Sequence, residues 1–219
     1  MDMKSEVKGK VEKFFKEYRL RKYDKGQILI FNGVNSNDIY FIVSGRVKEY
    51  DVSDNGDEII LNIFGSSAFF PASHMLNRSN NRYIFEAETA IEVRQAPVGD
   101  VLKFIKQNPD VLLDLLGRVY AGIDGIFSRM MHLMSGKAKD RLIYEIITEA
   151  RRFGTRGTDG SYEIQLNEKD LGSRAGLSRE TVSREVSKLK STGLIETRHN
   201  SMLLKDLSVL EAALNSKPS

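Results

Sequence analysis

The sequence predicts an α+β protein in which an N-terminal antiparallel β-roll is followed by a long helix and a C-terminal winged helix-turn-helix domain. Three observations support this prediction. Short β-rich segments end at glycines between Tyr23 and Ala96, apolar residues recur at spacings of three and four from Val111 to Met134, and two helical patterns flank a glycine turn from Leu171 to Leu189. A chain of 219 residues with 41% hydrophobic content can form two modest domains, each with its own core.

The N-terminal part is expected to be a helix followed by the roll. Residues 1 to about 20 carry Val11, Phe14, Phe15 and Tyr18 at helical spacing. β-rich segments follow, most of them ending at a glycine: Ile28–Phe31, Ile39–Val43, Val47–Val52, Ile59–Phe64, Tyr83–Ala87 and Ala90–Val93. Strands at this regular spacing are typical of an antiparallel roll or barrel.

From Val98 the periodicity becomes helical, with a short helix and then a long one that begins near Pro109. The long helix carries a nearly continuous apolar stripe: Val111, Leu112, Leu115, Val119, Ile123, Ile126, Met130, Leu133 and Met134. The spacing is that of a coiled-coil seam, and the roll has no element long enough to cover all of it. We therefore expect a homodimer, the alternative being that the roll itself buries the stripe.

Ser135-Gly136 interrupts the stripe and is the expected domain boundary and hinge. A further helix is expected from about Lys137 to Phe153, with Gly154 as its stop. The predicted organisation is a roll with flanking helices over residues 1–108, a dimerisation helix and hinge over 109–136, and a winged helix-turn-helix domain over 137–219.

The helix-turn-helix is predicted from its capping residues. Asn167 can cap the first helix, with Asp170 three residues on as its partner, Gly176 supplies the turn, and Ser178 can cap the second helix. After this helix stops at residues 191–193, the segments 194–198 and 201–205 are expected to form the two strands of a wing.

The second helix of this motif has one apolar and one polar face. Val182, Val186 and Leu189 recur at spacings of four and three and share the buried stripe. Guanidinium, carboxylate and hydroxyl groups crowd the N-terminal half of the other face: Arg179, Glu180, Ser183, Arg184 and Ser187. A helix that reads base edges in the major groove of double-stranded DNA needs this arrangement, and an ordinary helical hairpin with solvated charges is the alternative.

Charge supports the DNA-binding interpretation. From residue 137 onward the chain has 15 Lys and Arg against 12 Asp and Glu, whereas the earlier residues balance, so the net charge of +3 lies in the C-terminal part. Contact with phosphates requires an excess of this sign. The excess is small, so it supports the motif without establishing DNA binding by itself.

The order of elements and several sequence stretches resemble the cyclic-AMP receptor/fumarate-nitrate regulator (CRP/FNR) family over nearly the whole chain. The most telling stretches are Lys25–Leu29, Tyr40–Val47, Asn108–Asp110 and Leu177–Arg184. The resemblance implies a cyclic-nucleotide-binding-like roll that acts as a sensor and rotates the DNA-binding domains about the hinge. It further implies a homodimeric, cytoplasmic bacterial transcription regulator that contacts RNA polymerase.

The resemblance also assigns roles in the second helix. Arg179, Glu180 and Arg184 stand where the cyclic-AMP receptor reads its TGTGA half-site, and Glu180, Ser183 and Arg184 match the set of the fumarate-nitrate regulator, whose relatives read TTGAT. We expect these four residues to read bases, because Arg184 can fork onto a guanine while Glu180 accepts a hydrogen bond from the paired cytosine. Arg179 favours TGTGA. Lys169 and Ser178 are better placed for phosphates, which set register rather than sequence.

The expected ligand pocket departs from the cyclic-AMP binders of this family. Where those proteins carry a Gly-Glu pair that holds the ribose, this chain reads Phe69-Phe70-Pro71-Ala72, and only Arg82 remains of the phosphate-binding Arg-Ser. Ile126 and Phe127 replace the polar residues that meet adenine. Burial would leave polar groups of a nucleotide unpaired, at a cost of about 1–3 kcal/mol each. We therefore expect a ligand other than cyclic AMP; a cyclic-nucleotide-responsive activator is kept as an alternative. The candidate pocket residues are Phe70, His74, Arg82, Ile126 and Phe127.

Haem is kept as an alternative cofactor for this apolar pocket, since some relatives hold haem in such a pocket and sense gases. His74 is the only histidine of the roll and the candidate axial ligand, against the simpler interpretation of a loop histidine with a structural role. Arg82 could serve an anionic ligand, or be an ordinary surface arginine.

Other classes of protein are disfavoured. With no cysteine, the chain cannot build a thiolate-held iron–sulfur cluster or zinc finger. An oxygenase of the cupin type needs clustered histidines, but the three histidines stand at 74, 132 and 199, and no P-loop or nucleophile motif is present, so we expect no enzyme and no metal site. No apolar run approaches the ~18 residues of a membrane span, and no signal peptide precedes the charged start, so no membrane partner is expected.

Overall fold

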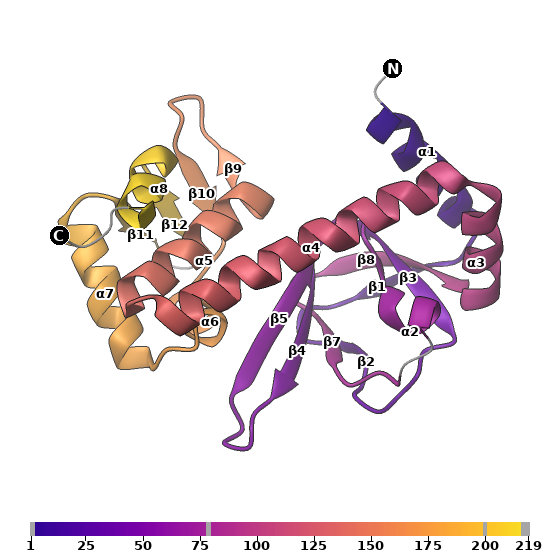
Figure 1. The fold of residues 1–219 in the computed structure, drawn as a ribbon, viewed down its shortest axis with the longest axis horizontal. Helices are drawn as coiled ribbons and strands as arrows, with labels where there is room; N and C mark the ends of the chain where they lie inside the picture. Colours follow the sequence, from indigo (N-terminus) through magenta and orange to yellow (C-terminus); the bar gives the residue numbers. More distant parts are fainter. Residues whose placement is uncertain (1–2, 78–79, 199–200, 216–219) are drawn as a thin grey trace. The chain divides into compact units, whose positions relative to one another are not determined.

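The computed structural model describes the backbone of residues 3–77, 80–198 and 201–215, and their side chains except those of residues 3, 4, 73, 74, 77, 135 and 215. The chain divides into two compact units, Met1–Gly122 and Ile123–Ser219. The division falls within the long helix α4 (Pro109–Ser135), which contributes its first half to one unit and its second half to the other (Figure 1).

The first unit is a β-roll made of two antiparallel four-stranded sheets. One sheet has the strand order β1-β8-β3-β6 and the other has the order β2-β7-β4-β5. The strands are β1 (Leu20–Tyr23), β2 (Ile28–Ile30), β3 (Asp38–Ser44), β4 (Val47–Val52), β5 (Glu58–Phe64), β6 (Phe69–Phe70), β7 (Ile84–Ala87) and β8 (Ile91–Pro97). The helices that flank them are α1 (Met3–Lys16), α2 (Ala72–Asn77) and α3 (Val98–Gln107).

The alternation of side chains along β3 builds two cores in this unit. Tyr40 and Ile42 point into the roll, where they join buried residues of the opposite sheet such as Val47 and Phe85. Ile39 and Phe41 point the other way and pack against α1, α3 and the first turns of α4. One strand therefore ties the roll to its helices.

Gly45 makes the turn between β3 and β4 tight enough for both strands to reach the roll. Its φ of +85° lies in the left-handed region, and an added Cβ would collide with the backbone carbonyl of Ala90 and the side chains of Ile91 and Thr89. Only glycine satisfies both conditions.

All six predicted strand segments contain a strand, but the sequence prediction missed other elements. β1 lies between the expected first helix, which was predicted to end at about residue 20, and the first predicted β-rich segment; its exposed, polar residues give no apolar alternation, and it is a strand because it pairs with β8. β6 has two residues and α2 has six, too few for a period to show. Residue 74 thus lies in a helix rather than in a loop, and the side chain of His74 lies outside the described residues.

The second unit contains the winged helix-turn-helix together with the second half of α4. Its further elements are α5 (Ala138–Phe153), β9 (Thr155–Arg156), β10 (Tyr162–Ile164), α6 (Glu168–Ala175), α7 (Arg179–Ser191), β11 (Ile195–Thr197), β12 (Met202–Leu204) and α8 (Leu207–Asn215). The sheet order is β11-β12-β10-β9, so the predicted wing strands β11 and β12 pair with each other. The turn between them, with His199, lies outside the described residues. The sequence prediction missed β9, β10 and α8.

The helix ends of this unit agree with the predicted stops, with one difference in geometry. α5 ends at Gly154, whose N–H donates to the carbonyl of Ala150, but Gly154 is extended rather than left-handed. A glycine is used there because a Cβ would collide with the backbone of Ala150. α6 ends at Gly176, which supplies the expected turn and is left-handed, with φ +60°.

The apolar stripe of α4 is covered by its own chain only at the start. Val111 and Leu115 are buried in the core formed with α1 and α3, so the alternative that the roll buries the stripe holds for these positions. Large apolar side chains of the remaining helix are exposed: Leu112, Leu113, Leu116, Val119, Tyr120, Ile126, Phe127, Met130, Met131, Leu133 and Met134. We call this set the α4 apolar face. These residues are gathered on one helix, whereas exposed apolar residues that need no explanation are scattered singly over a surface.

Candidate DNA interface

The helix-turn-helix forms because side chains cap both of its helices. The Oδ1 of Asn167 accepts a hydrogen bond from the backbone N–H of Asp170 at 2.9 Å and so starts α6. The Oγ of Ser178 accepts from the N–H of Thr181 at 3.4 Å and starts α7. Both caps are those that the sequence predicts. They define where α7 begins and therefore which of its side chains lie in the first turns.

The two faces of α7 are separated as the sequence predicts. Val182, Val186 and Leu189 are buried in the core of the second unit. The polar side chains of the first turns are exposed and together line an open, shallow depression: Arg179, Glu180, Ser183, Arg184 and Ser187. The structure thus places all four predicted base-reading residues on one accessible face.

A carboxylate that the sequence interpretation missed lies beside this face. Glu185 is buried, and its Oε1 accepts from the Nζ of Lys188 at 2.9 Å and lies 3.4 Å from the Nε of Arg184. The hydrogen bond from Lys188 lowers the pKa of Glu185, so this carboxylate stays ionised. The contact with Arg184 is long, which makes it a weak tether that leaves the guanidinium available.

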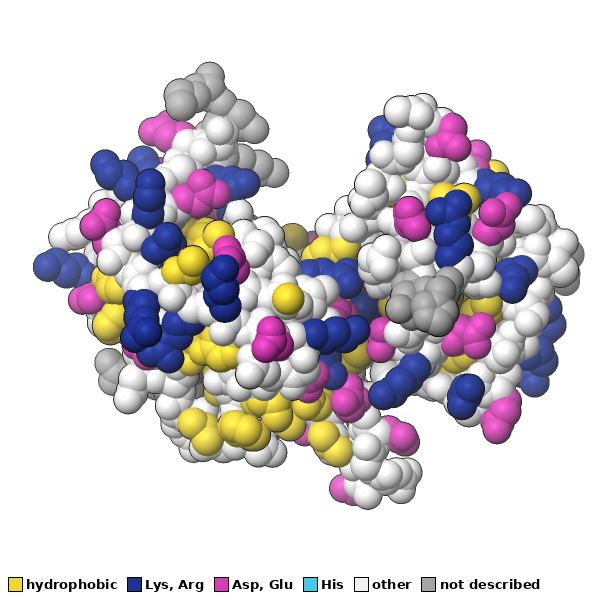
Figure 2. All heavy atoms as spheres, turned by 180° about the vertical axis from the view of Figure 1, so that it is seen from behind, with side chains coloured by type: hydrophobic (Ala, Val, Ile, Leu, Met, Phe, Trp, Pro, Cys, Tyr) yellow, Lys and Arg dark blue, Asp and Glu magenta, His cyan; other side chains and the backbone are white. Residues whose placement is uncertain are grey.

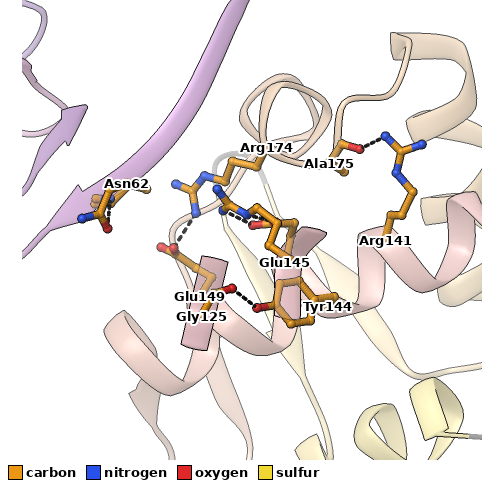
Figure 3. Close-up of polar contacts among 10 residues, drawn as sticks. Asn62, Gly125, Arg141, Tyr144, Glu145, Glu149, Arg174 and Ala175 are labelled. Carbon is orange, nitrogen blue, oxygen red and sulfur yellow. Dashed lines mark hydrogen bonds and ion pairs between the residues drawn. The ribbon is translucent and has the colours of Figure 1, made fainter. Parts of the chain in front are cut away.

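Arg141 fixes the turn between the two helices. The Nη2 of this α5 residue donates to the carbonyl of Gly176 at 2.8 Å and also to the carbonyl of Ala175. Figure 3 shows the contact with Ala175. These are carbonyls at the C-terminal end of α6, where a positive charge is favourable. A Cβ at position 176 would lie 2.8 Å from the same Nη2, so glycine is required there for space as well as for φ.

A buried charged network ties α6 to the helices beneath it. The Nη1 of Arg174 in α6 lies 2.6 Å from the Oε2 of Glu149 in α5, and both side chains are almost fully buried (Figure 3). One turn earlier in α5, both oxygens of Glu145 accept from Arg129 of α4, at 2.8 and 2.9 Å. Burial raises the pKa of Glu145, although Arg129 acts in the opposite direction. Periodicity alone could not reveal this network, because charged residues are normally assigned to the surface.

The wing and the start of α6 supply positive groups around the helix. Lys169 is exposed at the start of α6. In the wing, Lys205 pairs with Glu196 at 2.7 Å, and Arg198 pairs with Glu163 at 3.5 Å. Figure 2 shows one face of the molecule, on which Lys and Arg side chains are interspersed with Asp and Glu. The residues of α7, rather than an uninterrupted basic surface, therefore indicate a DNA interface.

Comparison with known proteins agrees with this geometry. Residues 20–108 match the cyclic nucleotide-binding domain family, and residues 140–213 match the Crp-like helix-turn-helix domain family. Together they cover well over half of the chain. The chain belongs to the CRP/FNR family.

Two sequence relatives and a solved structure illustrate the relationship. The cAMP-activated global transcriptional regulator CRP of Haemophilus influenzae is 21% identical over 192 residues, which are 87% of this chain and 86% of that protein. The HTH-type transcriptional regulator ArcR of Staphylococcus aureus is 28% identical over 188 residues, 84% and 79% of the two chains. The c-di-GMP responsive global regulator CLP of Xanthomonas campestris has the same fold, with a TM-score of 0.77 at 19% identity, over 90% of this chain and 98% of that one.

This CRP/FNR protein is accordingly a DNA-binding transcription regulator with a helix-turn-helix, and its relatives belong to a family of regulators rather than enzymes. In the part of the chain that the structure describes, no helix is long and apolar enough to cross a membrane. No three His, Asp or Glu side chains of the described residues are grouped to hold a metal ion.

The residues predicted for the ligand pocket of this CRP/FNR regulator lie in different environments. Phe70 is fully buried in the roll, with its ring 5.2 Å from that of Phe85 and 5.4 Å from that of Phe64. Arg82 is exposed. Ile126 and Phe127 are exposed on α4, in the other unit. Phe70 and Arg82 therefore belong to the first unit, and Ile126 and Phe127 belong to the second.

Glu49 is a residue of the roll interior that the sequence interpretation missed. It stands on β4 directly opposite Phe85 of β7 and Asn62 of β5, and Phe85 belongs to the buried core of the roll. Residues opposite each other on neighbouring strands point to the same face, so the carboxyl of Glu49 faces the interior. Burial raises the pKa of Glu49 to about 7, and it is the only cause of this shift. Because side chains alternate along a strand, Glu49 shares a face of β4 with Val47. The sequence alone did not show that this face is the inner one.

The stability of this CRP/FNR protein should depend on pH through Glu49. Its folded-state pKa lies above that of an unfolded glutamate, so the folded chain holds this proton more tightly and the free energy of unfolding falls as the pH rises from about 4.5 to about 7. Glu49→Gln should therefore raise the free energy of unfolding by roughly 1–3 kcal/mol at pH 8 and leave it unchanged at pH 4. Urea denaturation across this pH range measures the effect. Glu17→Gln, at an exposed position, is the matched control, and a difference between Glu49→Gln and the wild type that does not vary with pH would contradict the interior position.

Proposed function

We propose that the protein is a homodimeric transcription regulator that binds a palindromic TGTGA-like site and is gated by a ligand other than cyclic AMP. The observation that carries this proposal is the exposed set of Arg179, Glu180, Ser183 and Arg184 in the first turns of α7. The first turns of a recognition helix are the part that enters the major groove, so these side chains would meet base edges there.

The four side chains supply complementary hydrogen-bonding groups. Arg184 carries a planar donor fork that matches O6 and N7 of a guanine, and Glu180, one turn earlier on the same face, can accept from the amino group of the paired cytosine. Arg179 offers a second fork for another guanine, which supports TGTGA over TTGAT. Ser183 can serve either half-site, because a hydroxyl both donates and accepts.

Phosphate contacts would set the register of the helix. Lys169 is exposed at the start of α6. The hydroxyl of Ser178 is engaged in capping α7, so its contribution to a phosphate would come from the helix N-terminus that it creates. These contacts add affinity for any duplex without adding specificity.

The α4 apolar face supports the homodimer. A second copy of the same helix would cover it, and a two-fold axis would present two copies of α7 to successive major grooves, about one helical turn or ~34–36 Å apart. We infer that the three-part organisation follows from this arrangement: a sensory roll over residues 1–108, a dimerisation helix with a hinge at Gly136 over 109–136, and a DNA-binding domain over 137–219. Such a regulator acts in the cytoplasm with RNA polymerase.

Three features of the roll disfavour cyclic AMP as the ligand that gates the regulator. The roll lacks the glutamate of the Gly-Glu pair that holds the ribose in the cyclic-AMP binders, and Arg82 is exposed. Glu49 adds an interior carboxyl that an anionic nucleotide would have to meet. Haem remains the cofactor alternative of the sequence interpretation. Because the side chain of His74 lies outside the described residues, no observation in the structure favours it.

Removing the Arg184 side chain tests the base-reading role. Arg184→Ala should weaken binding to a TGTGA palindrome by roughly 1–3 kcal/mol and relax discrimination at the G·C pair it shares with Glu180, because a bidentate contact is lost. Lys169→Ala should instead weaken binding to all duplexes equally and flatten the salt dependence. Fluorescence anisotropy on cognate and scrambled duplexes at several salt concentrations measures both. If Arg184→Ala weakens the two duplexes equally, Arg184 contacts only phosphate.

A further inference from the structure

We propose that the ligand of the roll is a small organic cation and that Glu49 is the residue that holds it. The inference rests on the proposed function, since it names the chemical class of the ligand that gates the regulator. It assigns the specificity of the roll to one carboxylate on β4 and to the aromatic rings beside it.

Strand pairing places Glu49 in a row that crosses one sheet of the roll. From β2 through β7 and β4 to β5 the row consists of Ile30, Phe85, Glu49 and Asn62. Ile30 and Phe85 are buried in the roll core, so the whole row faces inward. The outer face of β4 is occupied by Lys48, which pairs with Glu86 and Glu58. Glu49 is thus separated by the sheet from the cations and anions of the outer surface.

Among the residues of the roll that the structure describes, none is a charged partner of the Glu49 carboxyl. Its side chain makes no hydrogen bond or ion pair with any residue that the structure describes. The groups opposite it are the neutral amide of Asn62 and the ring of Phe85, while Asp51, two residues on, pairs with Ile59 near the β4–β5 turn. Glu49 is only partly buried, so part of this residue is accessible to solvent. A partly buried carboxylate that lacks a cation is stabilised by any ligand that brings one.

Aromatic rings beside Glu49 complete a site suited to an organic cation. Phe64, Phe70 and Phe85 form a cluster with ring centroids 5.2 to 6.2 Å apart. Phe85 is the direct cross-strand neighbour of Glu49, and Phe64 stands two residues from Asn62 on β5. Aromatic faces attract cations and apolar groups alike. A carboxylate next to such rings favours a ligand that joins an ammonium or guanidinium group to a small apolar body.

The same arrangement disfavours anionic ligands. Arg82 is exposed and does not contribute to the pKa of Glu49, which burial alone raises. An anion beside Glu49 would therefore meet a like charge that Arg82 does not compensate. The two relatives described as responsive to cyclic AMP and c-di-GMP respond to anionic molecules, so this chain is expected to differ from them in the sign of its ligand.

The test uses the full chain and a set of probes matched in shape. Ammonium ions from methylammonium to benzylammonium are compared with the corresponding alcohols and carboxylates, and with cyclic AMP, by thermal unfolding at pH 8. At about ten times its dissociation constant, the best ammonium probe should raise Tm by roughly 3–5 °C, and the alcohols, carboxylates and cyclic AMP should leave it unchanged. Glu49→Gln should abolish the shift, whereas the exposed control Glu17→Gln should keep it. The affinity of the best probe should be about tenfold lower at pH 6 than at pH 8, because only the ionised carboxyl binds it.

Three outcomes would overturn the proposal: no ammonium ion stabilises the wild type more than its matched alcohol, Glu49→Gln retains the shift, or a carboxylate or cyclic AMP stabilises the wild type instead. Binding of the same samples to a TGTGA palindrome is measured in parallel. If the protein binds DNA but no ammonium ion raises its Tm, the proposed class of ligand is wrong and the proposed function stands. An ammonium shift in a protein that binds no DNA would overturn the proposed function instead.

Discussion

Ile126→Asp should convert the protein from a dimer into a monomer. The Ile126 side chain is 61% exposed in the single chain, so the substitution leaves the core of either unit untouched. In a dimer built on the α4 apolar face it would bury two unpaired carboxylates close to the two-fold axis, at a cost of several kcal/mol. Binding to a palindromic duplex should fall on the order of 100-fold, because each recognition helix then binds alone. Sedimentation equilibrium measures the dimer, and anisotropy measures the DNA affinity.

Ser128→Asp is the matched control for this prediction. Ser128 is also exposed and lies two residues from Ile126, which places it on the opposite side of the helix. It should remain a dimer and retain its DNA affinity. An Ile126→Asp variant that sediments as a dimer would show that the α4 apolar face has another role.

Arg174→Ala should destabilise the DNA-binding unit by roughly 3–5 kcal/mol, because it removes the guanidinium from a buried carboxylate. The Nη1 of Arg174 lies 2.6 Å from the Oε2 of Glu149, and the two side chains are 3% and 1% exposed. The melting temperature of this unit should fall by about 10 °C or more. Thermal unfolding followed by circular dichroism measures the shift.

Arg151→Ala is the matched control, since Arg151 pairs with Glu211 at 2.8 Å but is 63% exposed. It should cost less than about 1 kcal/mol, as exposed ion pairs do. The double variant Glu149→Leu/Arg174→Leu should recover much of the stability, because apolar groups can replace a buried ion pair. Equal losses for Arg174→Ala and Arg151→Ala would contradict a structural role for the network.

The elements that the sequence predicted best are those with a strong period and a cap. The helix-turn-helix has both, so its buried stripe, its caps at Asn167 and Ser178 and its turn at Gly176 are confirmed. Short elements without a period were missed: β6 has two residues, and β1 is a strand only because β8 lies beside it. Tertiary pairing decides such segments, and a single sequence does not encode it locally.

The candidate sites show the same division. Side chains on α7 were predictable, because helical spacing places them on one face. The charges that hold α6 in place, Glu149 and Arg174, lie 25 residues apart and become partners only when α5 and α6 pack together. Glu49 depends in the same way on which face of β4 turns inward, which is set by its pairing with β5 and β7.

In vitro selection from random duplexes, with the full-length protein, tests the central claim most directly. Two copies of α7 related by a two-fold axis should enrich an inverted repeat with half-sites about one helical turn apart (~34–36 Å), each centred on TGA and preceded by TG. Enrichment of TTGAT half-sites would retain the symmetric model and reassign Arg179. Enrichment of a direct repeat, or of half-sites without TGA, would contradict both the roles given to Glu180 and Arg184 and the symmetric dimer.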